Sequence, residues 1–497
     1  MKQQLGRLGK STLVYGVGGV LNRFLNFLLL PVFTAYLSPA DYGVISIVGV
    51  VAFLVTSIFS LGFGAATAPC YFESNNQARK EATIWTAFTI LAVSTSVLAV
   101  VGVVFSRQIS ELAFQTPEYH YLVMVSLLSA CLSILSEPWG LYLRFEERAK
   151  MFVTLVTIST LVSIGLSVIM VVVLRRGLLG MIEGSFIAQA FTLFLYMLVT
   201  APGLRFRFDL TLGRELLRLG IPLIPSFAFL FVMHQGNKYV LQWFHGLEAV
   251  GVYTIGFNLG MGMGIAVNAF TNAWLPYFMS FIDKKEEARN LFGRILTYYV
   301  VGFGALNVLL FIVAKPVVMI MTQPVFHEAY KAVGFSASAQ FLVGLFSILL
   351  PGVYFAKDVK YITLVQAGSA LISVGFNLLL IPPFGLLGAA IALMLGTLSM
   401  VILQQAWNFR RRHDYLNVHY EWDRILAFGL VYVAYAVLML WQRNLPLLGE
   451  VVISTVGIVL LLLVLYGLLN SSERKVVRNI AKRLRPLGIE AIGKAQL

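Results

Sequence analysis

The sequence predicts an all-α integral membrane protein of about 14 transmembrane helices, built as two parallel six-helix repeats plus two extra helices. The first observation is composition. Hydrophobic residues make up 59% and charged residues 12% of the 497 residues, against roughly 25% charged residues in an average soluble protein. The second observation is length, because fourteen apolar stretches can each cross a hydrocarbon core, which takes roughly 20 residues. Strands of a membrane barrel would instead alternate over segments of about ten residues.

The third observation is an internal repeat at an offset of 208 residues. The four residues Gly177 to Gly180 recur as Gly385 to Gly388, and the pair Gly43 and Val44 recurs as Gly251 and Val252. Adding 208 maps each of the first six apolar segments onto a later one, as Tyr42 to Pro69 maps onto the start of Val250 to Phe281. Because six is even, both halves enter the membrane in the same orientation. Transporters that open alternately to two sides about a central site have such halves.

The repeat divides the chain into four predicted parts. We expect a first six-helix lobe over 1–208, a second over 209–416, two additional transmembrane helices over 417–469 and a basic cytoplasmic tail over 470–497. In the tail, Ser471 or Ser472 can cap a helix, and Val476 and Ile480 then fall on one face. The tail is therefore predicted to be an amphipathic helix held against anionic lipid.

Lysine and arginine are distributed unevenly between alternate loops. Of the 37 basic residues, 29 fall on the side of both termini, six on the opposite side and two inside apolar segments. This is the positive-inside bias that orients membrane proteins, so both termini are predicted to be cytoplasmic. The same bias accounts for the net charge of +14 without nucleic acid as a partner.

The sequence offers no chemistry for an enzyme. No segment between spans exceeds about twenty residues, and the six histidines never approach a metal-ligand spacing. Neither a Gly-x-Ser-x-Gly motif nor a phosphate-binding loop occurs, so no catalytic residue, metal or cofactor is expected. Gly260 and Gly264, four residues apart in the eighth span, predict close helix packing instead. The two cysteines, Cys70 and Cys131, imply no disulfide framework.

Ionisable residues inside spans are the most informative candidates for a binding site. Arg23 lies at the middle of the first apolar segment, where a guanidinium costs between about 3 and 10 kcal/mol unless a partner or a water-lined cavity receives it. We therefore expect Arg23 to face inward, beside Asn22 and with Asn26 on nearly the same helical face. An alternative is an interhelical salt bridge from Arg23 to Glu137 or Glu183.

Lys238 is the counterpart of Arg23 in the second half, although subtracting 208 lands on Leu30 instead. Gln235 and Asn237 precede Lys238 and give its helix a face too polar for lipid contact. An alternative is that Lys238 extends its ammonium to the outer membrane interface. In the eighth span, Asn268 and Asn272 are predicted to form another wall of the same cavity.

Two acidic residues lie inside spans and have two open interpretations. Glu137 is about six residues from the cytoplasmic end of the fourth span, and Glu183 is about six from the outer end of the sixth. Each carboxyl group could bind a coupling proton or cation, because burial makes its charge state switchable. Each could equally be a counter-ion for Arg23.

Several short stretches resemble one family. They are Leu21 to Pro31, Leu37 to Gly43, Gly220 to Leu223, Asn237 to Leu241, Val250 to Tyr253 and Ile381 to Ala390. Together they resemble bacterial polysaccharide-biosynthesis flippases of the O-antigen (Wzx) type, in the superfamily of multidrug, oligosaccharidyl-lipid and polysaccharide exporters, whose multidrug branch is MATE. Relatives often carry Asp-Arg where this chain has Asn237 and Lys238, so the basic charge survives here and the acidic one does not.

The resemblance implies a fold, a cargo and a location. It implies a V-shaped, MATE-like bundle of two six-helix lobes around a central cavity, in the inner (plasma) membrane of a bacterium. Because the central charge is Arg23, whose planar fork suits a diphosphate, we expect a flippase for polyprenyl-diphosphate-linked oligosaccharide in cell-surface polysaccharide biosynthesis. The expected partners are that lipid-linked substrate and membrane lipids, with polysaccharide polymerase or assembly proteins as further candidates.

Three alternative functions stay open at this point. The first is a cation-coupled antiporter of drugs or small molecules, which Arg23 disfavours because cationic cargo calls for carboxylates. The second is a lipid II flippase, which has the same fold and a similarly basic cavity. The third is a non-transporting scaffold for polysaccharide assembly, in which charged residues inside spans can be neutralised without consequence.

Overall fold

The computed structural model describes residues 25, 27–74, 76–356, 358, 360–411, 418, 421–440 and 446–468. Across these residues every regular element is a helix, and ten helical segments are long and apolar enough to span a membrane. The predicted all-α membrane fold is therefore confirmed. The predicted tail over 470–497 lies outside the described residues, and the boundaries proposed at 208 and 416 stay predictions.

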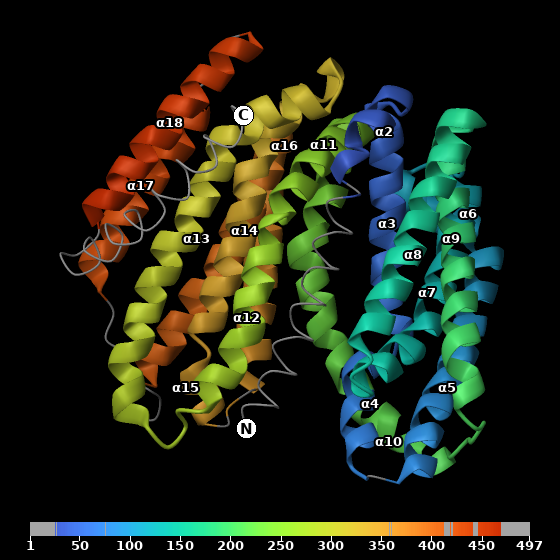
Figure 1. The fold of residues 1–497 in the computed structure, drawn as a ribbon. Helices are drawn as coiled ribbons and strands as arrows, with labels where there is room; N and C mark the ends of the chain where they lie inside the picture. Colours follow the sequence, from blue (N-terminus) through green and yellow to red (C-terminus); the bar gives the residue numbers. More distant parts are fainter. Residues whose placement is uncertain are drawn as a thin grey trace, which may run out of the picture.

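The helices form two lobes that meet at one end of the molecule and diverge toward the other, which gives the predicted V shape (Figure 1). The first lobe contains α2 (Leu30–Tyr36), α3 (Pro39–Phe59), α4 (Phe63–Phe72), α5 (Gln77–Val104), α6 (Ser106–Phe114), α7 (His120–Phe145), α8 (Ala149–Val168) and α9 (Gly177–Thr200). The second half of the chain contains α10 (Leu210–Gly220), α11 (Ile224–Met261), α12 (Met263–Met279), α13 (Lys285–Met321), α14 (Tyr330–Ile348), α15 (Pro351–Phe355) and α16 (Lys360–Arg410).

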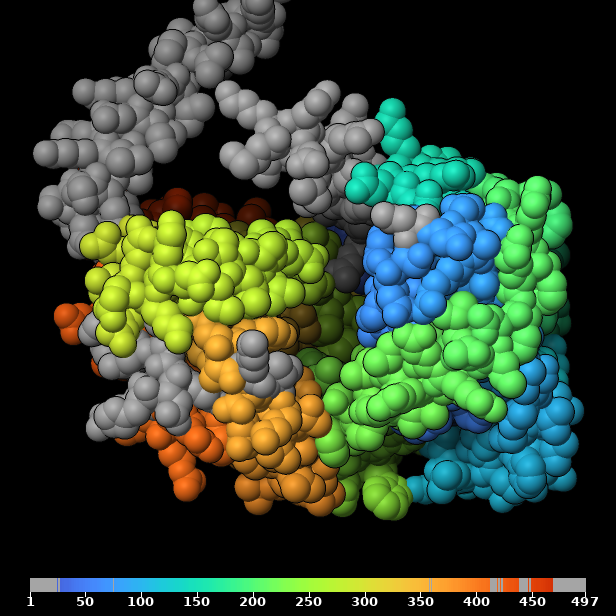
Figure 2. Space-filling model, turned by 90° about the horizontal axis from the view of Figure 1, so that it is seen from below, coloured from blue at the N-terminus to red at the C-terminus, as the bar shows by residue number. Residues whose placement is uncertain are grey.

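We call the end that carries α10 the inner end and the end where α3 begins the outer end. At the outer end, Ser38 starts α3 with a capping box, in which its hydroxyl accepts the backbone N–H of Asp41 and the Asp41 carboxylate accepts that of Ser38. At the inner end, the Asp209 side chain caps α10 by accepting the N–H groups of Thr211 and Leu212. Seen from the inner end, the two lobes stand side by side, and α10 lies on the first lobe against α4 and α5 (Figure 2).

Two long helices each contain residues of two predicted spans, and a glycine interrupts each of these helices between the spans. α11 has non-helical backbone at Gly246 (φ 78°) and α16 at Gly385 (φ 53°). Gly177, the equivalent of Gly385 at the offset of 208, has a φ of 52°. A positive φ is readily adopted by glycine and costs other residues. The first glycine of the repeated motif therefore has the same positive φ in both halves.

Equivalent residues of the two halves touch each other at the outer end. Ser46 in α3 and Thr254 in α11 are 208 positions apart, and the Thr254 Oγ1 lies 2.8 Å from the Ser46 Oγ in a hydrogen bond. Both residues are buried. A residue meets its own equivalent only on a two-fold axis, so the axis between the halves passes close to this pair.

A second contact is reciprocal, as the same axis requires. A Cβ atom added to Gly43 would lie 2.0 Å from the carbonyl oxygen of Leu247, and one added to Gly251 would lie 1.8 Å from that of Pro39. Gly43 and Gly251 are equivalent, and so are Pro39 and Leu247. Only a hydrogen atom fits at these two positions, which lets α3 and α11 approach closely.

The structure divides two spans that the sequence shows as single apolar stretches. The second span is broken between α3 and α4, where Leu61 and Gly62 both have positive φ. The eighth is interrupted at the single residue Gly262 between α11 and α12, where φ and ψ stay helical at −55° and −31°. A discontinuous span frees backbone groups, which membrane proteins tolerate where protein or a cavity receives them. Each break lies beside a cavity described below.

The predicted close packing at Gly260 and Gly264 is confirmed. A Cβ added to Gly260 would lie 2.3 Å from the carbonyl oxygen of Val333 in α14, and one added to Gly264 would lie 2.9 Å from the Gln340 Oε1. The eighth span therefore presses directly on α14.

The two extra helices, α17 (Trp422–Leu440) and α18 (Leu447–Leu468), pack on the outside of the second lobe against α13. The Lys315 ammonium of α13 forms an ion pair of 2.7 Å with the Glu450 carboxylate of α18. The Ser454 hydroxyl donates to the carbonyl oxygen of Ile312 at 2.8 Å. These polar contacts fix α18 to α13 in a setting where apolar packing alone gives little preference.

Candidate functional site

A cavity of about 710 Å³ lies between the two halves, toward the outer end. Phe27, Phe33 and Met181 line it from the first half, and the second half contributes helices α11, α12 and α14. The break at Gly262 opens on it, beside the amides of Asn258, Asn268 and Gln340. No charged side chain lines this cavity among the described residues, so its polar wall consists of uncharged hydrogen-bonding groups.

A second cavity of about 660 Å³ lies toward the inner end. The first half lines most of it, through the break between α3 and α4, α7, α9 and Phe152 of α8, and the second half contributes Phe227 of α11. Glu137 and Arg144 line it together with several hydroxyl groups and the amide of Gln189. A Cβ added to Gly64 in α4 would lie 2.4 Å from the Glu137 Oε1, so the lack of a side chain at residue 64 makes room for this carboxylate.

Lys238 is buried inside the second half, with 5% of its surface exposed. Its ammonium lies 4.7 Å from the centre of the Phe257 ring, a cation–π contact. No carboxylate of a described residue pairs with it. This placement does not match the alternative in which Lys238 extends to the membrane interface.

The neighbours of Lys238 are placed in different settings. The Asn237 amide donates to the Tyr253 hydroxyl and, at 3.4 Å, to the carbonyl oxygen of Ala389, and no part of Asn237 is exposed. These contacts hold helices of the second half together, which argues against Asn237 as a cavity wall. The Gln235 Oε1 is buried without a hydrogen-bond partner among the described residues.

The two eighth-span asparagines are both exposed, and only Asn268 lines the cavity between the halves. Asn272, one helical turn nearer the inner end, is outside both cavities. Asn22, Arg23 and Asn26 lie outside the described residues, so their predicted place in the cavity stays a prediction.

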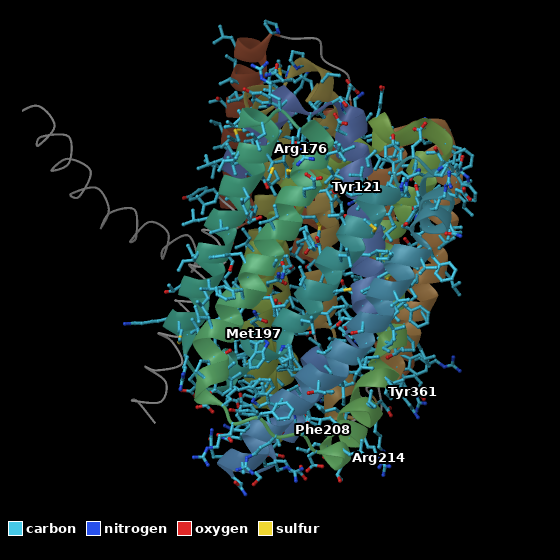
Figure 3. The ribbon with its side chains drawn as sticks, turned by 90° about the vertical axis from the view of Figure 1, so that its right-hand side faces the viewer. Tyr121, Arg176, Met197, Phe208, Arg214 and Tyr361 are labelled. Carbon is cyan, nitrogen blue, oxygen red and sulfur yellow. The ribbon has the colours of Figure 1, made fainter. Side chains whose placement is uncertain are left out.

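The two acidic candidates, Glu137 and Glu183, lie in different surroundings. The Glu183 carboxylate pairs with the Arg176 guanidinium at 2.7 Å and accepts the Tyr121 hydroxyl at 2.9 Å. Arg176 and Tyr121 lie close together near the outer end (Figure 3). Glu183 therefore has a local basic partner at the surface, which weakens both of its predicted roles. Glu137 lines the inner cavity and forms no ion pair with a described residue.

Sequence reasoning missed Arg144 as a site residue. The charge count assigned it to a cytoplasmic loop, whereas it belongs to the last turn of α7. The sequence does contain a pattern that indicates this placement. Four residues recur at intervals of three or four and so share one helical face: Ser133, Glu137, Gly140 and Arg144.

The described helices form two parallel halves related by a two-fold axis around internal cavities, an architecture found in membrane transporters. The sequence identifies the family. Residues 8–282 match the family described as polysaccharide biosynthesis protein, and the chain belongs to that family. No curated protein sequence matches the chain.

Solved structures with the same fold are distant in sequence. A lipid II flippase MurJ in an inward closed conformation aligns with a TM-score of 0.67 at 13% identity, covering 92% of this chain and 98% of MurJ. An inward-facing multidrug-resistance MATE transporter aligns with a TM-score of 0.63 at 16% identity, covering 82% of this chain and 96% of that one. The MATE transporter DinF-BH in complex with R6G aligns with a TM-score of 0.62 at 15% identity, covering 82% and 96%. At these identities the similarity shows the shared fold.

Proposed function

We propose that the protein is a flippase that moves a polyprenyl-diphosphate-linked oligosaccharide from the cytoplasmic to the outer leaflet by alternating access. The polar headgroup would travel through the space between the halves while the isoprenoid tail stays in lipid. This route spares the sugar hydroxyls the cost of transfer into hydrocarbon. The family supports the polysaccharide pathway, and the resulting product would serve cell-surface polysaccharide biosynthesis.

The observation that carries this proposal is the uncharged amide lining of the cavity between the halves. Asn258, Asn268 and Gln340 offer hydrogen bonds to a sugar, and no carboxylate among the described lining residues would repel a diphosphate. An exporter of cationic drugs would need an acidic wall there. This observation therefore favours the anionic cargo over the drug antiporter.

Arg23 is the proposed diphosphate ligand. Phe27 lines the cavity between the halves, and Arg23 precedes Phe27 by four residues, one helical turn. We therefore propose that Arg23 lies on the same face, next to the inner end of this cavity. Its guanidinium would make paired charge-assisted hydrogen bonds to a diphosphate.

The membrane potential supports export in this direction. If the positive-inside bias orients the chain as proposed, the inner end faces a negative cytoplasm. Each negative charge carried fully outward then gains about 2.3 kcal/mol per 100 mV, so a dianionic headgroup gains about 4 to 5 kcal/mol. The forward step would need no coupled ion.

The test is a leaflet-accessibility assay in proteoliposomes loaded with polyprenyl-diphosphate-linked oligosaccharide. Arg23→Ala should abolish flipping without loss of membrane insertion, and Arg23→Lys should keep part of the activity. Normal flipping by Arg23→Ala would refute diphosphate capture by this residue. A chain that flips no lipid-linked sugar but confers drug resistance would favour the antiporter, and one that does neither would favour the scaffold.

A further inference from the structure

The side chains that line the inner cavity change in character along one face of α7. Arg144 is exposed in the last turn of the helix, and its guanidinium lies over the Phe152 ring, 5.5 Å from the ring centre. No ion pair joins Arg144 to a described residue. The inner end of a span lies at the level of the lipid headgroups, so this exposed cation stands where the phosphates of the leaflet at the inner end lie.

Deeper in the same cavity, the lining changes from a cation to hydrogen-bonding groups. Glu137 precedes Arg144 by seven residues, which is two helical turns or about 10 Å along the axis. Gln189 and Thr192 of α9 face the same space, and the Gln189 amide reaches the Ser136 hydroxyl at 3.5 Å. Carboxylate, amide and hydroxyl groups together both donate to and accept from the hydroxyls of a sugar.

We propose that this cavity is the loading site for the lipid-linked sugar on the cytoplasmic side; it shares no lining residue with the cavity near the outer end. Arg144 binds the diphosphate at headgroup level, and Glu137 with Gln189 binds the sugar that follows it. The proposal rests on the proposed flippase function. The cavity volume of about 660 Å³ falls within the range of small-molecule sites, roughly 300 to 1,000 Å³.

The arrangement also excludes two other ligands. A phospholipid headgroup would use Arg144 alone and leave the Glu137 end of the cavity unfilled. A cationic drug would be drawn to Glu137 but would meet Arg144 at the opening, where like charges repel. A headgroup that is anionic first and hydroxyl-rich further on satisfies both ends.

The test measures binding of two probes to the full-length protein in phosphatidylcholine nanodiscs. The probes are farnesyl diphosphate and the same lipid carrying a disaccharide. Arg144→Ala should weaken both probes about tenfold or more, because it removes the charge-assisted bonds to the diphosphate. Glu137→Leu should weaken only the glycosylated probe, and Glu137→Gln should do so to a smaller degree.

Matched controls lie just beyond the cavity. Arg148 contacts the Tyr142 ring at 5.7 Å, and Glu147 is exposed, and neither lines the cavity. Arg148→Ala and Glu147→Gln should therefore bind both probes as the unmodified protein does. Arg144→Lys keeps the charge without the planar fork and should give an intermediate affinity. This variant also tests the role of Arg144 if Arg144→Ala folds poorly.

Several outcomes would overturn the loading site. It is wrong if Arg144→Ala binds both probes normally, if Glu137→Leu weakens both probes equally, or if phosphatidylglycerol displaces farnesyl diphosphate as well as unlabelled probe does. Normal flipping of the lipid-linked sugar together with any of these results would refute this site alone. Failure of the unmodified protein to flip that lipid would refute the proposed function.

Discussion

The close approach of the two halves at the outer end can be tested by adding one methyl group. In Gly251→Ala the new Cβ would lie 1.8 Å from the Pro39 carbonyl oxygen, whereas ordinary contact begins near 3.4 Å. The methyl group therefore needs about 1.6 Å of additional space. Both contacting groups belong to helix backbone, so the space comes from separation of α3 and α11.

This separation should shift the conformational equilibrium toward a state open at the outer end. Overpacking of a close contact costs about 1 to 3 kcal/mol. An outward-open state of the proposed transport cycle would lack the contact, so the ratio of closed to open molecules should fall by about 5- to 150-fold. Residues near the two-fold axis then become accessible to reagents outside the membrane.

The assay is labelling of Ser46→Cys by a membrane-impermeant maleimide. Ser46 is buried, with 6% of its surface exposed, so the labelling rate reports opening at the outer end. Gly251→Ala should raise this rate about tenfold or more. Gly49→Ala is the matched control, because a Cβ at Gly49 in the same helix as Ser46 meets no atom within 4 Å. Unchanged labelling in Gly251→Ala, or an equal rise in Gly49→Ala, would refute the reasoning.

Three further changes test other contacts. Oxidation of a Ser46→Cys, Thr254→Cys double variant should form a cross-link that stops flipping until reductant is added, because those hydroxyl oxygens lie 2.8 Å apart; continued flipping by cross-linked protein would mean that this contact never opens. Lys315→Met should lower the stability of the protein by about 3 kcal/mol because Glu450 is left buried and unpaired; thermal unfolding in detergent measures this, and adding Glu450→Leu should restore part of it. Lys238→Ala should slow flipping less than Arg23→Ala does, measured in the same proteoliposomes; an equal loss would make the buried ammonium as important as Arg23.

Much of the fold could be predicted because it depends on patterns that a linear sequence contains. The length of the apolar stretches predicted the spans, and the motif shared by Gly177 and Gly385 predicted the two halves. The structure explains why that motif survives in both copies, since each glycine holds the same positive φ. The breaks at Gly62 and Gly262 were not predicted, because hydropathy is continuous across them and no proline marks either position.

The candidate site was harder to predict, because lining a cavity is a property of neighbours distant in sequence. Asn237 and Asn268 are the same residue type in adjacent spans, yet one is fully buried between helices and the other is exposed to a cavity. Arg144 was counted with loop charges because it lies at the end of a span. Its proposed role depends on α4, which comes roughly 80 residues earlier in the chain, and on α9, which comes roughly 40 residues later, because both helices line the same cavity.

The reciprocal contact between Gly43 and Gly251 has a consequence for the ancestry of the chain. Two halves that meet through the same residues, in the same orientation, make the interface that two identical polypeptides make as a symmetric dimer. A gene encoding six spans would thus already specify both sides of this interface. Fusion of two copies would then let the cavity-lining residues of the two halves diverge. The second half now contributes amides to the outer cavity, and the first half contributes Glu137 to the inner one.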